Sequence, residues 1–238
     1  MRTKTLLITA ALSAAGLLPS MAQVFSVNAV GYVNQSIPAG GYAIIANPLN
    51  GNPDNNLNTV LPLPNDGSYD GAGIYRFNPA TQGYRDTMQW VSGVGWLASD
   101  PADLVVPPGE GFFLQNVAGS ALNVTFVGEV PAGSPTHNAM PSANKYSIRS
   151  ALVPKGGPIG WEGLANSLGF PAENGDSLFI FDRNTQGYKD TVQYVDGVGW
   201  LSSDYPPEGP TIDPGTGFFL QKSPSATKAS WDMPFSVN

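Results

Sequence analysis

Hydrophobic and polar residues alternate in short runs along most of the chain, which is the pattern of half-buried β-strands. The runs that predict strands are Phe25–Val33, Tyr42–Ala46, Ile74–Phe77, Tyr84–Val91, Gly111–Gln115, Asn123–Val127 and Lys145–Arg149. Clusters of Gly, Pro, Asn and Asp separate them, so the chain reads as strands joined by turns. Short helices are expected only near residues 56–61 and 162–168. The pattern therefore predicts an all-β fold with at most short helices.

The chain contains one segment twice. Residues 71–100 align without a gap on residues 175–204, and 17 of the 30 positions are identical. A second block, Pro-Gly-x-Gly-Phe-Phe-Leu-Gln, recurs at 108–115 and 214–221. We infer two tandem, duplicated units that are sandwich-like or barrel-like, β unit 1 at 23–131 and β unit 2 at 132–238.

Alternation within the repeat also predicts which side chains face inward. Tyr75 and Phe77 share one strand face and match Phe179 and Phe181, so this face is expected to be core. In the next strand Tyr84, Asp86, Met88 and Trp90 are expected to share a face.

The N-terminal residues have the three parts of an export signal. Arg2 and Lys4 precede an apolar run at Leu6–Leu18, and Ser20-Met21-Ala22 fits a small-x-Ala cleavage site. A signal peptide at 1–22 predicts a periplasmic, cell-surface or extracellular protein. Elsewhere no apolar run is long enough for a transmembrane anchor. The chain has no cysteine, which excludes a disulfide framework.

The chain is acidic. Its formal net charge is −7, and removal of Arg2 and Lys4 would make it −9. An acidic chain without a basic stretch gains no counterion release on a polyanion, so nucleic acid is excluded as a partner.

The chain is poorly equipped for catalysis. Its only histidine, His137, lies in a Pro/Gly/Ser-rich stretch at 132–143 that reads as a linker, and there is no thiol. Glycoside hydrolysis needs only two carboxylates, about 5–9 Å apart. The candidates for such a pair are Asp86, Asp100, Glu110, Asp190 and Asp204. Because Glu110 becomes Thr216 in the second copy, a pair that includes Glu110 does not survive duplication as a unit, and we predict that the protein is not an enzyme.

The best binding candidates are aromatic. Trp96 and Trp200 end the repeated Gly-Val-Gly-Trp, and an indole in such a corner can either stack on a sugar ring or close the end of the core. The side chains expected to surround such a platform are Tyr84, Tyr188, Asp86, Asp190, Gln89 and Gln193. The two aspartates must be hydrogen-bonded or lie at the rim, since an unpaired buried carboxylate costs several kcal/mol.

Oxygen-rich spacing occurs at Asp54-Asn55-Asn56 and at Asp182-Arg183-Asn184. Neither segment has the terminal bidentate acid of an EF-hand, and hairpin turns explain both. No metal site or cofactor is predicted, with a structural calcium ion as the weaker alternative.

The tetrapeptide Phe-Ser-Val-Asn stands at 25–28 and again at 235–238. The last strand is expected either to close the second sheet or to pair with the N-terminal strand of the same or a neighbouring molecule.

The chain resembles a group of secreted tandem-repeat β modules of Gram-negative bacteria that have no assigned activity. The resemblance rests on Asn47-Pro48-Leu49, Thr81-Gln82-Gly83-Tyr84 and Pro108-Gly109-Glu110-Gly111-Phe112-Phe113. It covers most of both copies, although the second has Ser150-Ala151-Leu152 where the Asn-Pro would stand. It implies an exported β protein and assigns no catalytic residue.

Two functions fit these observations. The first is a secreted, non-catalytic envelope or extracellular structural or interaction protein, which works through β-domain surfaces and self-association. The alternative is a carbohydrate-binding protein with paired aromatic sites at Trp96 and Trp200, where duplication would raise avidity for a polysaccharide.

Overall fold

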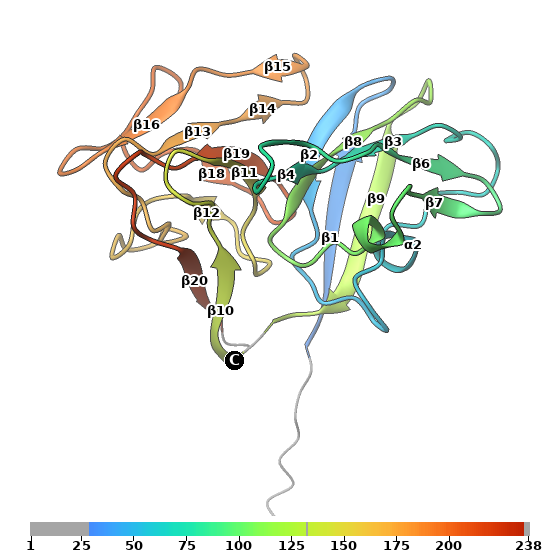
Figure 1. Cartoon of the computed structure of the whole chain (residues 1–238), viewed down its shortest axis with the longest axis horizontal. Helices are drawn as coiled ribbons and strands as arrows, with labels where there is room; N and C mark the ends of the chain where they lie inside the picture. Colours follow the sequence, from blue (N-terminus) through green and yellow to red (C-terminus); the bar gives the residue numbers. More distant parts are fainter. Residues whose placement is uncertain (1–28, 132, 236–238) are drawn as a thin grey trace, which may run out of the picture.

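A computed structural model describes residues 29–131 and 133–235 and confirms the all-β prediction. The first half lies on the right of Figure 1 and the second half on the left. The expected signal peptide, the tetrapeptide at 25–28 and residues 236–238 lie outside the described residues. Within those residues, no helix is of a length and apolarity that would cross a membrane.

The first half consists of a five-stranded sheet and a long antiparallel pair, β1 with β9. The sheet order is β2-β8-β3-β6-β7, and a small hairpin, β4-β5, extends from it. The strands are β1 (Val30–Ile37), β2 (Tyr42–Ala46), β3 (Gly73–Tyr75), β4 (Phe77–Asn78), β5 (Gly83–Tyr84), β6 (Met88–Val91), β7 (Gly95–Leu97), β8 (Gly111–Gln115) and β9 (Leu122–Glu129).

The second half has the corresponding parts in the same order. Its sheet runs β11-β19-β13-β16-β17, with the long pair β10-β20, the hairpin β14-β15 and an added pair, β12-β18. The strands are β10 (Gly133–Ala139), β11 (Tyr146–Arg149), β12 (Gly157–Pro158), β13 (Ser177–Phe179), β14 (Phe181–Asp182), β15 (Gly187–Tyr188), β16 (Val192–Val195), β17 (Gly199–Leu201), β18 (Thr211–Ile212), β19 (Phe218–Gln221) and β20 (Ser230–Phe235).

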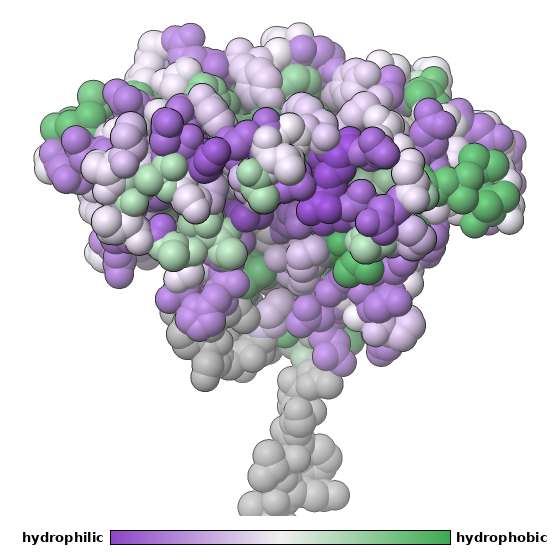
Figure 2. All heavy atoms as spheres, viewed as in Figure 1, coloured by the Kyte–Doolittle hydropathy of each residue, from purple (hydrophilic) through white to green (hydrophobic). Residues whose placement is uncertain are grey.

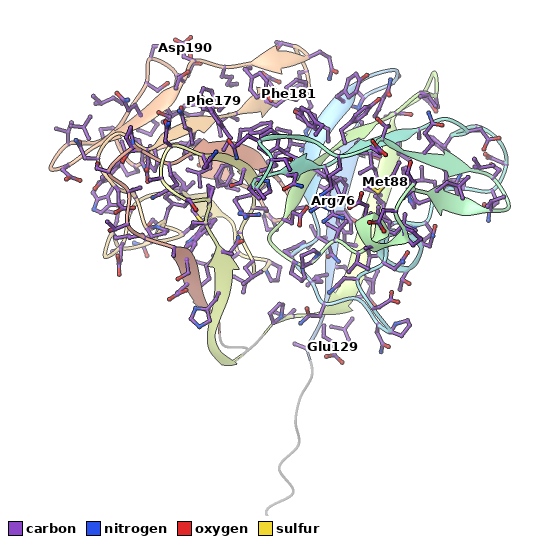
Figure 3. The ribbon with its side chains drawn as sticks, in the orientation of Figure 1. Arg76, Met88, Glu129, Phe179, Phe181 and Asp190 are labelled. Atoms are coloured by element: carbon purple, nitrogen blue, oxygen red, sulfur yellow. The ribbon has the colours of Figure 1, made fainter. Side chains whose placement is uncertain are left out.

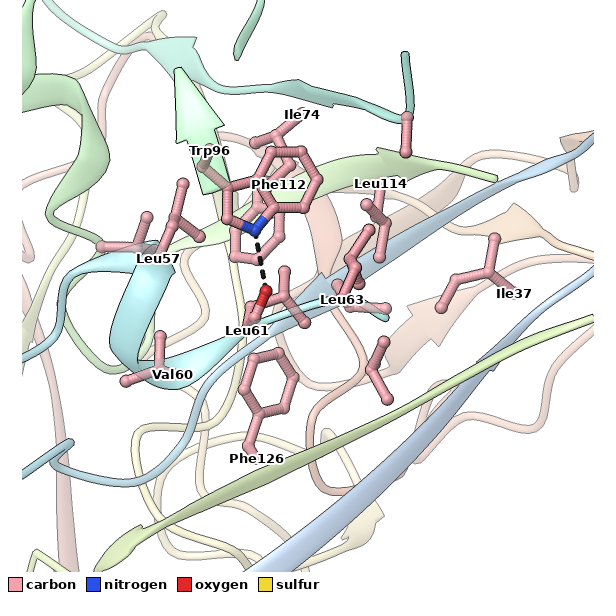
Figure 4. Close-up of a cluster of buried hydrophobic side chains, with 14 of the residues drawn as sticks. Ile37, Leu57, Val60, Leu61, Leu63, Ile74, Trp96, Phe112, Leu114 and Phe126 are labelled. Atoms are coloured by element: carbon pink, nitrogen blue, oxygen red, sulfur yellow. Dashed lines mark hydrogen bonds between the residues drawn. The ribbon is translucent and has the colours of Figure 1, made fainter. Parts of the chain in front are cut away.

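Each half has its own hydrophobic core between its sheet and its long strand pair. In the first, Ile37 of β1 and Phe126 of β9 face Ile74 and Phe112 of the sheet, and all are buried (Figure 4). In the second, Phe170, Phe218 and Trp231 pack edge to face. Each such side chain contributes about 1.5–3 kcal/mol through burial, so two separate cores stabilise a chain without disulfides.

The strand face that carries Tyr75 and Phe77 does not point into a core, so that prediction is wrong. Ile74 of β3 is fully buried in the core, and alternation turns Tyr75 to the opposite face of the sheet. Phe179 and Phe181 in the second half are likewise only half-buried (Figure 3). The predicted strand at 84–91 is also divided, because β5 ends at Tyr84 and β6 begins at Met88. Tyr84 and Asp86 are therefore exposed, whereas Met88 is buried.

One of the two expected helices is present. α2 (Leu57–Val60) begins at Asn56, whose side chain accepts from the Asn58 amide as an N-cap. No helix forms at 162–168, because Gly163 and Asn166 have φ values of 88° and 57° and the chain makes turns there. A 3-10 helix, η2 (Pro101–Leu104), follows β7 and is capped by Asp100.

The stretch around His137 is not a linker. It forms β10, which pairs with β20 across a register shift between Gly133 and Thr136. Such an irregularity accommodates Pro135, which cannot donate to a ladder. His137 lies opposite Asp232, and their side chains are 2.7 Å apart.

The two halves are joined at the edges of their sheets. Isolated bridges connect Ile45 to Thr216 and Glu110 to Arg149. The Ala46 amide donates to the Gly215 carbonyl (2.9 Å), and the Ser150 amide donates to the Gly109 carbonyl (3.0 Å). The inner edge strands β2 and β11 are therefore covered, as stable edges must be.

The repeated Thr-Gln-Gly-Tyr turns form a reciprocal contact between the halves. Gln82 accepts from the Tyr146 amide (2.8 Å) and donates to the Tyr146 carbonyl (3.0 Å). Gln186 makes the same two bonds to Tyr42, at 2.7 and 3.0 Å. Both glutamines have positive φ, 59° and 55°, which turns each side chain toward the other half. The turn of hairpin β4-β5 thus bonds to edge strand β11 of the second half, and the turn of β14-β15 bonds to edge strand β2 of the first half.

We expect Gln82→Ala to lower the free energy of unfolding by about 1–2 kcal/mol, because it leaves a backbone donor and acceptor of Tyr146 without partners. Gln186→Ala should cost less, since its bonds are solvent-exposed. Urea unfolding of both variants tests this. No loss of stability in Gln82→Ala would show that the contact does not stabilise the junction, and equal losses in both variants would show that solvent exposure does not weaken the Gln186 contact.

Candidate functional site

An open groove of about 940 Å³ lies at the junction of the halves. Strand β1 forms one wall with residues 32–36. The other wall comes from the second half, from residues 180–184, from Lys189 and from several residues between 205 and 216. The groove thus exists only because the two halves pack together.

Arg183 and Gln35 hold the two walls together. The Arg183 guanidinium donates to the Ser36 carbonyl (2.8 Å) and to Gln35 Oε1 (2.9 Å). Gln35 in turn donates to the Pro214 carbonyl (2.8 Å). Gly215 has a φ of 79°, and a Cβ there would lie 2.7 Å from Val33 Cγ1. The repeated glycine therefore permits the close approach of the walls.

The rest of the lining combines aromatic rings with charged groups. Lys189 Nζ lies 5.6 Å from the centroid of the Tyr205 ring and 4.0 Å from an Asp182 oxygen. Burial raises the pKa of Tyr205, and the negative charges of Asp204 and Asp182 raise it further. Its hydroxyl therefore stays protonated and can both donate and accept a hydrogen bond.

The corresponding space in the first half is filled by an ionic network. Arg76 is buried and donates through Nε and Nη2 to Glu110 at 2.8 Å (Figure 3). Its remaining nitrogen donates to the Asp103 carbonyl, and Arg85 pairs with the Asp103 carboxylate. The repeat alignment places Ile180 at Arg76, Lys189 at Arg85 and Thr216 at Glu110. In the second half the loss of the Arg–Glu pair coincides with an open groove.

An aromatic face covers the outer side of the sheets. Phe77 packs against Phe219 and Phe113 against Phe181, each with ring centroids 5.3 Å apart. Tyr84 and Tyr188 extend this row at 5.5 Å from Phe77 and Phe181 and remain half exposed. Burial raises the pKa of Tyr188, and nearby Tyr84 adds to the effect. These two predicted site residues therefore come together, one from each half.

The outer ends of the molecule carry exposed apolar side chains. At Trp96 and Trp200, however, the backbone amides on the outer strand edges already have hydrogen-bond partners. Figure 2 shows hydrophobic patches at both far ends, where the β6-β7 and β16-β17 hairpins lie. The exposed residues there are Val94, Leu97, Val198 and Leu201. Asn58 accepts from the Trp96 amide (2.6 Å), and the Pro207 carbonyl accepts from the Trp200 amide (2.8 Å). Both edges are therefore blocked at these positions.

The prediction that Trp96 and Trp200 form sugar-stacking platforms is wrong. Each side chain is only 1% exposed. Their Nε1 atoms donate to the Leu61 carbonyl (2.7 Å; Figure 4) and the Gly160 carbonyl (2.8 Å). Both indoles belong to the hydrophobic cores, which is the alternative that the sequence left open.

The other predicted site residues do not gather around the tryptophans. Gln89 and Gln193 are exposed on β6 and β16. Asp86 and Asp190 are exposed, and Asp190 lies at the outer rim, where it accepts from the Ser203 hydroxyl (Figure 3). The eight residues proposed from the sequence therefore do not form one site.

The oxygen-rich segments are turns. Asp54 Oδ1 accepts from the Asn56 amide (3.1 Å), and Asp182 Oδ1 accepts from the Asn184 amide (2.8 Å). Across the described ranges, no three His, Cys, Asp or Glu side chains are grouped as a metal site would require.

No family model, curated protein or solved structure matches this chain. The resemblance to secreted tandem-repeat modules stays a prediction.

The groove residues were missed because no sequence motif marks them. The available signal was the difference between copies at 76/180 and 110/216, where an Arg–Glu pair is replaced by Ile and Thr. That difference indicates a change of environment, but only the packing of β1 against the second half reveals the groove.

Proposed function

We propose that this is an exported, non-catalytic interaction protein that holds a ligand in the groove between its two β halves. The observation that carries this proposal is the open groove at a position where the first half is closed by Arg76 and Glu110. Binding sites prefer such junctions, and they combine apolar walls with a few placed polar groups.

The state of the candidate catalytic groups supports a non-catalytic role. Glu110 is engaged by Arg76, and Asp100 caps η2. The His137 side chain is 69% exposed and paired with Asp232. These groups are used in structural contacts and do not surround the groove.

Grafting the residues of the first half into the second tests the proposal. The variant Ile180→Arg, Thr216→Glu should fill the groove with an ion pair like that of Arg76 and Glu110. A thermal-shift screen of the native chain against neutral oligosaccharides, acidic oligosaccharides and peptides should find a stabilising class, because a ligand that binds only the folded state raises Tm.

The grafted variant should fold and lose that shift. The matched control, Tyr84→Ala, changes an exposed tyrosine outside the groove and should keep it. A ligand that stabilises the native and grafted chains equally would place the binding surface elsewhere and contradict the proposal.

A further inference from the structure

The geometry points to a neutral carbohydrate as the ligand of the groove, with one sugar ring stacked on Tyr32 of β1. This inference rests on the proposed function and names its substrate class. It differs from the sequence-based hypothesis in both place and residues, because Trp96 and Trp200 are buried in the cores.

Among the residues that the structure describes, Tyr32 is the most exposed large hydrophobic residue, at 71%, and it lies on the groove wall. Its cross-strand partner, Val127, is itself 45% exposed, so packing on β9 does not explain the ring. A flat ring that is apolar on its faces and polar at its tip suits the C–H face of a sugar.

The groove also offers the polar groups that sugar hydroxyls need. The carboxylates of Glu208 and Asp213 line it, are exposed, and accept no hydrogen bond from the residues that the structure describes. Lys189 and the Tyr205 hydroxyl supply donors in the same groove. Vicinal hydroxyls donate and accept at once, and such a mixed lining satisfies both roles.

The charge of the groove selects against acidic polymers. Asp182, Glu208 and Asp213 face only two cations, Arg183 and Lys189, so the lining has a net charge of −1. The whole chain carries −7. An anionic polysaccharide would be repelled by the negative charge of the groove and of the whole chain, whereas a neutral polysaccharide would not be repelled.

A peptide added as a strand is the main competing occupant, because β1 pairs with β9 on one side only. Its outer edge is already engaged, since the Ser36 carbonyl accepts from Arg183. A peptide would have to displace the contact that holds the groove walls together.

Calorimetric titration of the full chain tests the inference. The probes are neutral hexasaccharides of β-1,4-glucose, β-1,4-xylose, α-1,4-glucose and β-1,4-N-acetylglucosamine, with oligogalacturonate as the acidic comparison. At least one neutral probe should bind and oligogalacturonate should not. Tyr32→Ala should weaken binding by about ten-fold or more, whereas Tyr32→Phe keeps the ring and should keep most of the affinity.

The controls separate this inference from the proposed function. Tyr84→Ala leaves the groove intact and should bind as the native chain does. If the grafted groove variant abolishes binding of a peptide or an acidic probe, the groove is the site but the ligand class is wrong. If no neutral probe binds, or if Tyr32→Ala binds as tightly as the native chain, the inference is overturned.

Discussion

Trp96→Ala and Trp200→Ala should each lower the free energy of unfolding by about 3–5 kcal/mol, the range for removing a large aromatic side chain from a core. Trp96 packs edge to face on Trp90 at 5.6 Å, and Trp200 contacts Tyr194 at 5.2 Å. Each substitution would also leave a buried carbonyl, of Leu61 or Gly160, without its indole donor. Most small domains have a total stability of only about 5–15 kcal/mol, so this loss is large.

The neighbouring residues provide matched controls for urea unfolding. Leu97 and Leu201 follow the tryptophans directly and are 48% and 47% exposed. Leu97→Ala and Leu201→Ala should stay within about 0.5 kcal/mol of the native chain. A stable Trp96→Ala, Trp200→Ala chain that had lost carbohydrate binding would contradict the core role and restore the indoles as a binding surface.

Local rules were sufficient to predict the fold class. Alternation and turn residues identified β2 and β8 with their observed bounds, Tyr42–Ala46 and Gly111–Gln115. A short helix was expected near residues 56–61, and α2 lies within that range. These features depend on neighbouring residues, which is why they are readable from a single sequence.

Features that depend on distant contacts were not predictable in this way. Alternation assigned Tyr75 and Phe77 to one face, but it could not say that this face lies away from the core, where Phe77 packs on Phe219 of the other half. The sequence pattern also could not show that Gln82 and Gln186 reach across the junction, since their partners are 64 and 144 positions away. The groove depends on the same long-range packing, so the candidate site had to come from the structure.

Lys222→Met should lower the free energy of unfolding by about 3–5 kcal/mol, because it removes the cation that pairs with both Asp176 and Glu173. Lys222 and Asp176 are fully buried and form an ion pair, and Glu173 lies 2.9 Å from Lys222 Nζ. Asp176 also accepts from the Ser223 amide (2.8 Å). With Lys222 gone, the buried Asp176 carboxylate would lose its ionic partner, which is the costly way to break a buried pair.

In the first half, the two positions that correspond to Asp176 and Lys222 are occupied by uncharged residues. The repeat alignment puts Ala72 at Asp176 and Asn116 at Lys222. Asn116 is fully buried and donates to the Ser120 and Pro38 carbonyls, at 2.7 and 3.0 Å. The double variant Asp176→Ala, Lys222→Asn should therefore cost clearly less than Lys222→Met alone. Lys228→Met is the control for a surface pair with Glu162 and should change stability by at most about 1 kcal/mol.

The pH dependence of unfolding gives an independent test of the same network. Burial alone would raise the pKa of Glu173, but hydrogen bonds from Lys222 and from the Thr227 and Lys228 amides outweigh it and lower the pKa to about 2. A carboxyl with a lowered folded-state pKa stabilises the fold fully above its ordinary value of 4.5 and loses that contribution as the pH falls toward about 2. In Lys222→Met the pKa of Glu173 should move back toward 4.5, so the stability gap between this variant and the native chain should shrink as the pH drops through that window. Urea unfolding at several pH values measures the gap. A gap that stays constant with pH would show that Lys222 stabilises the core by packing rather than by charge.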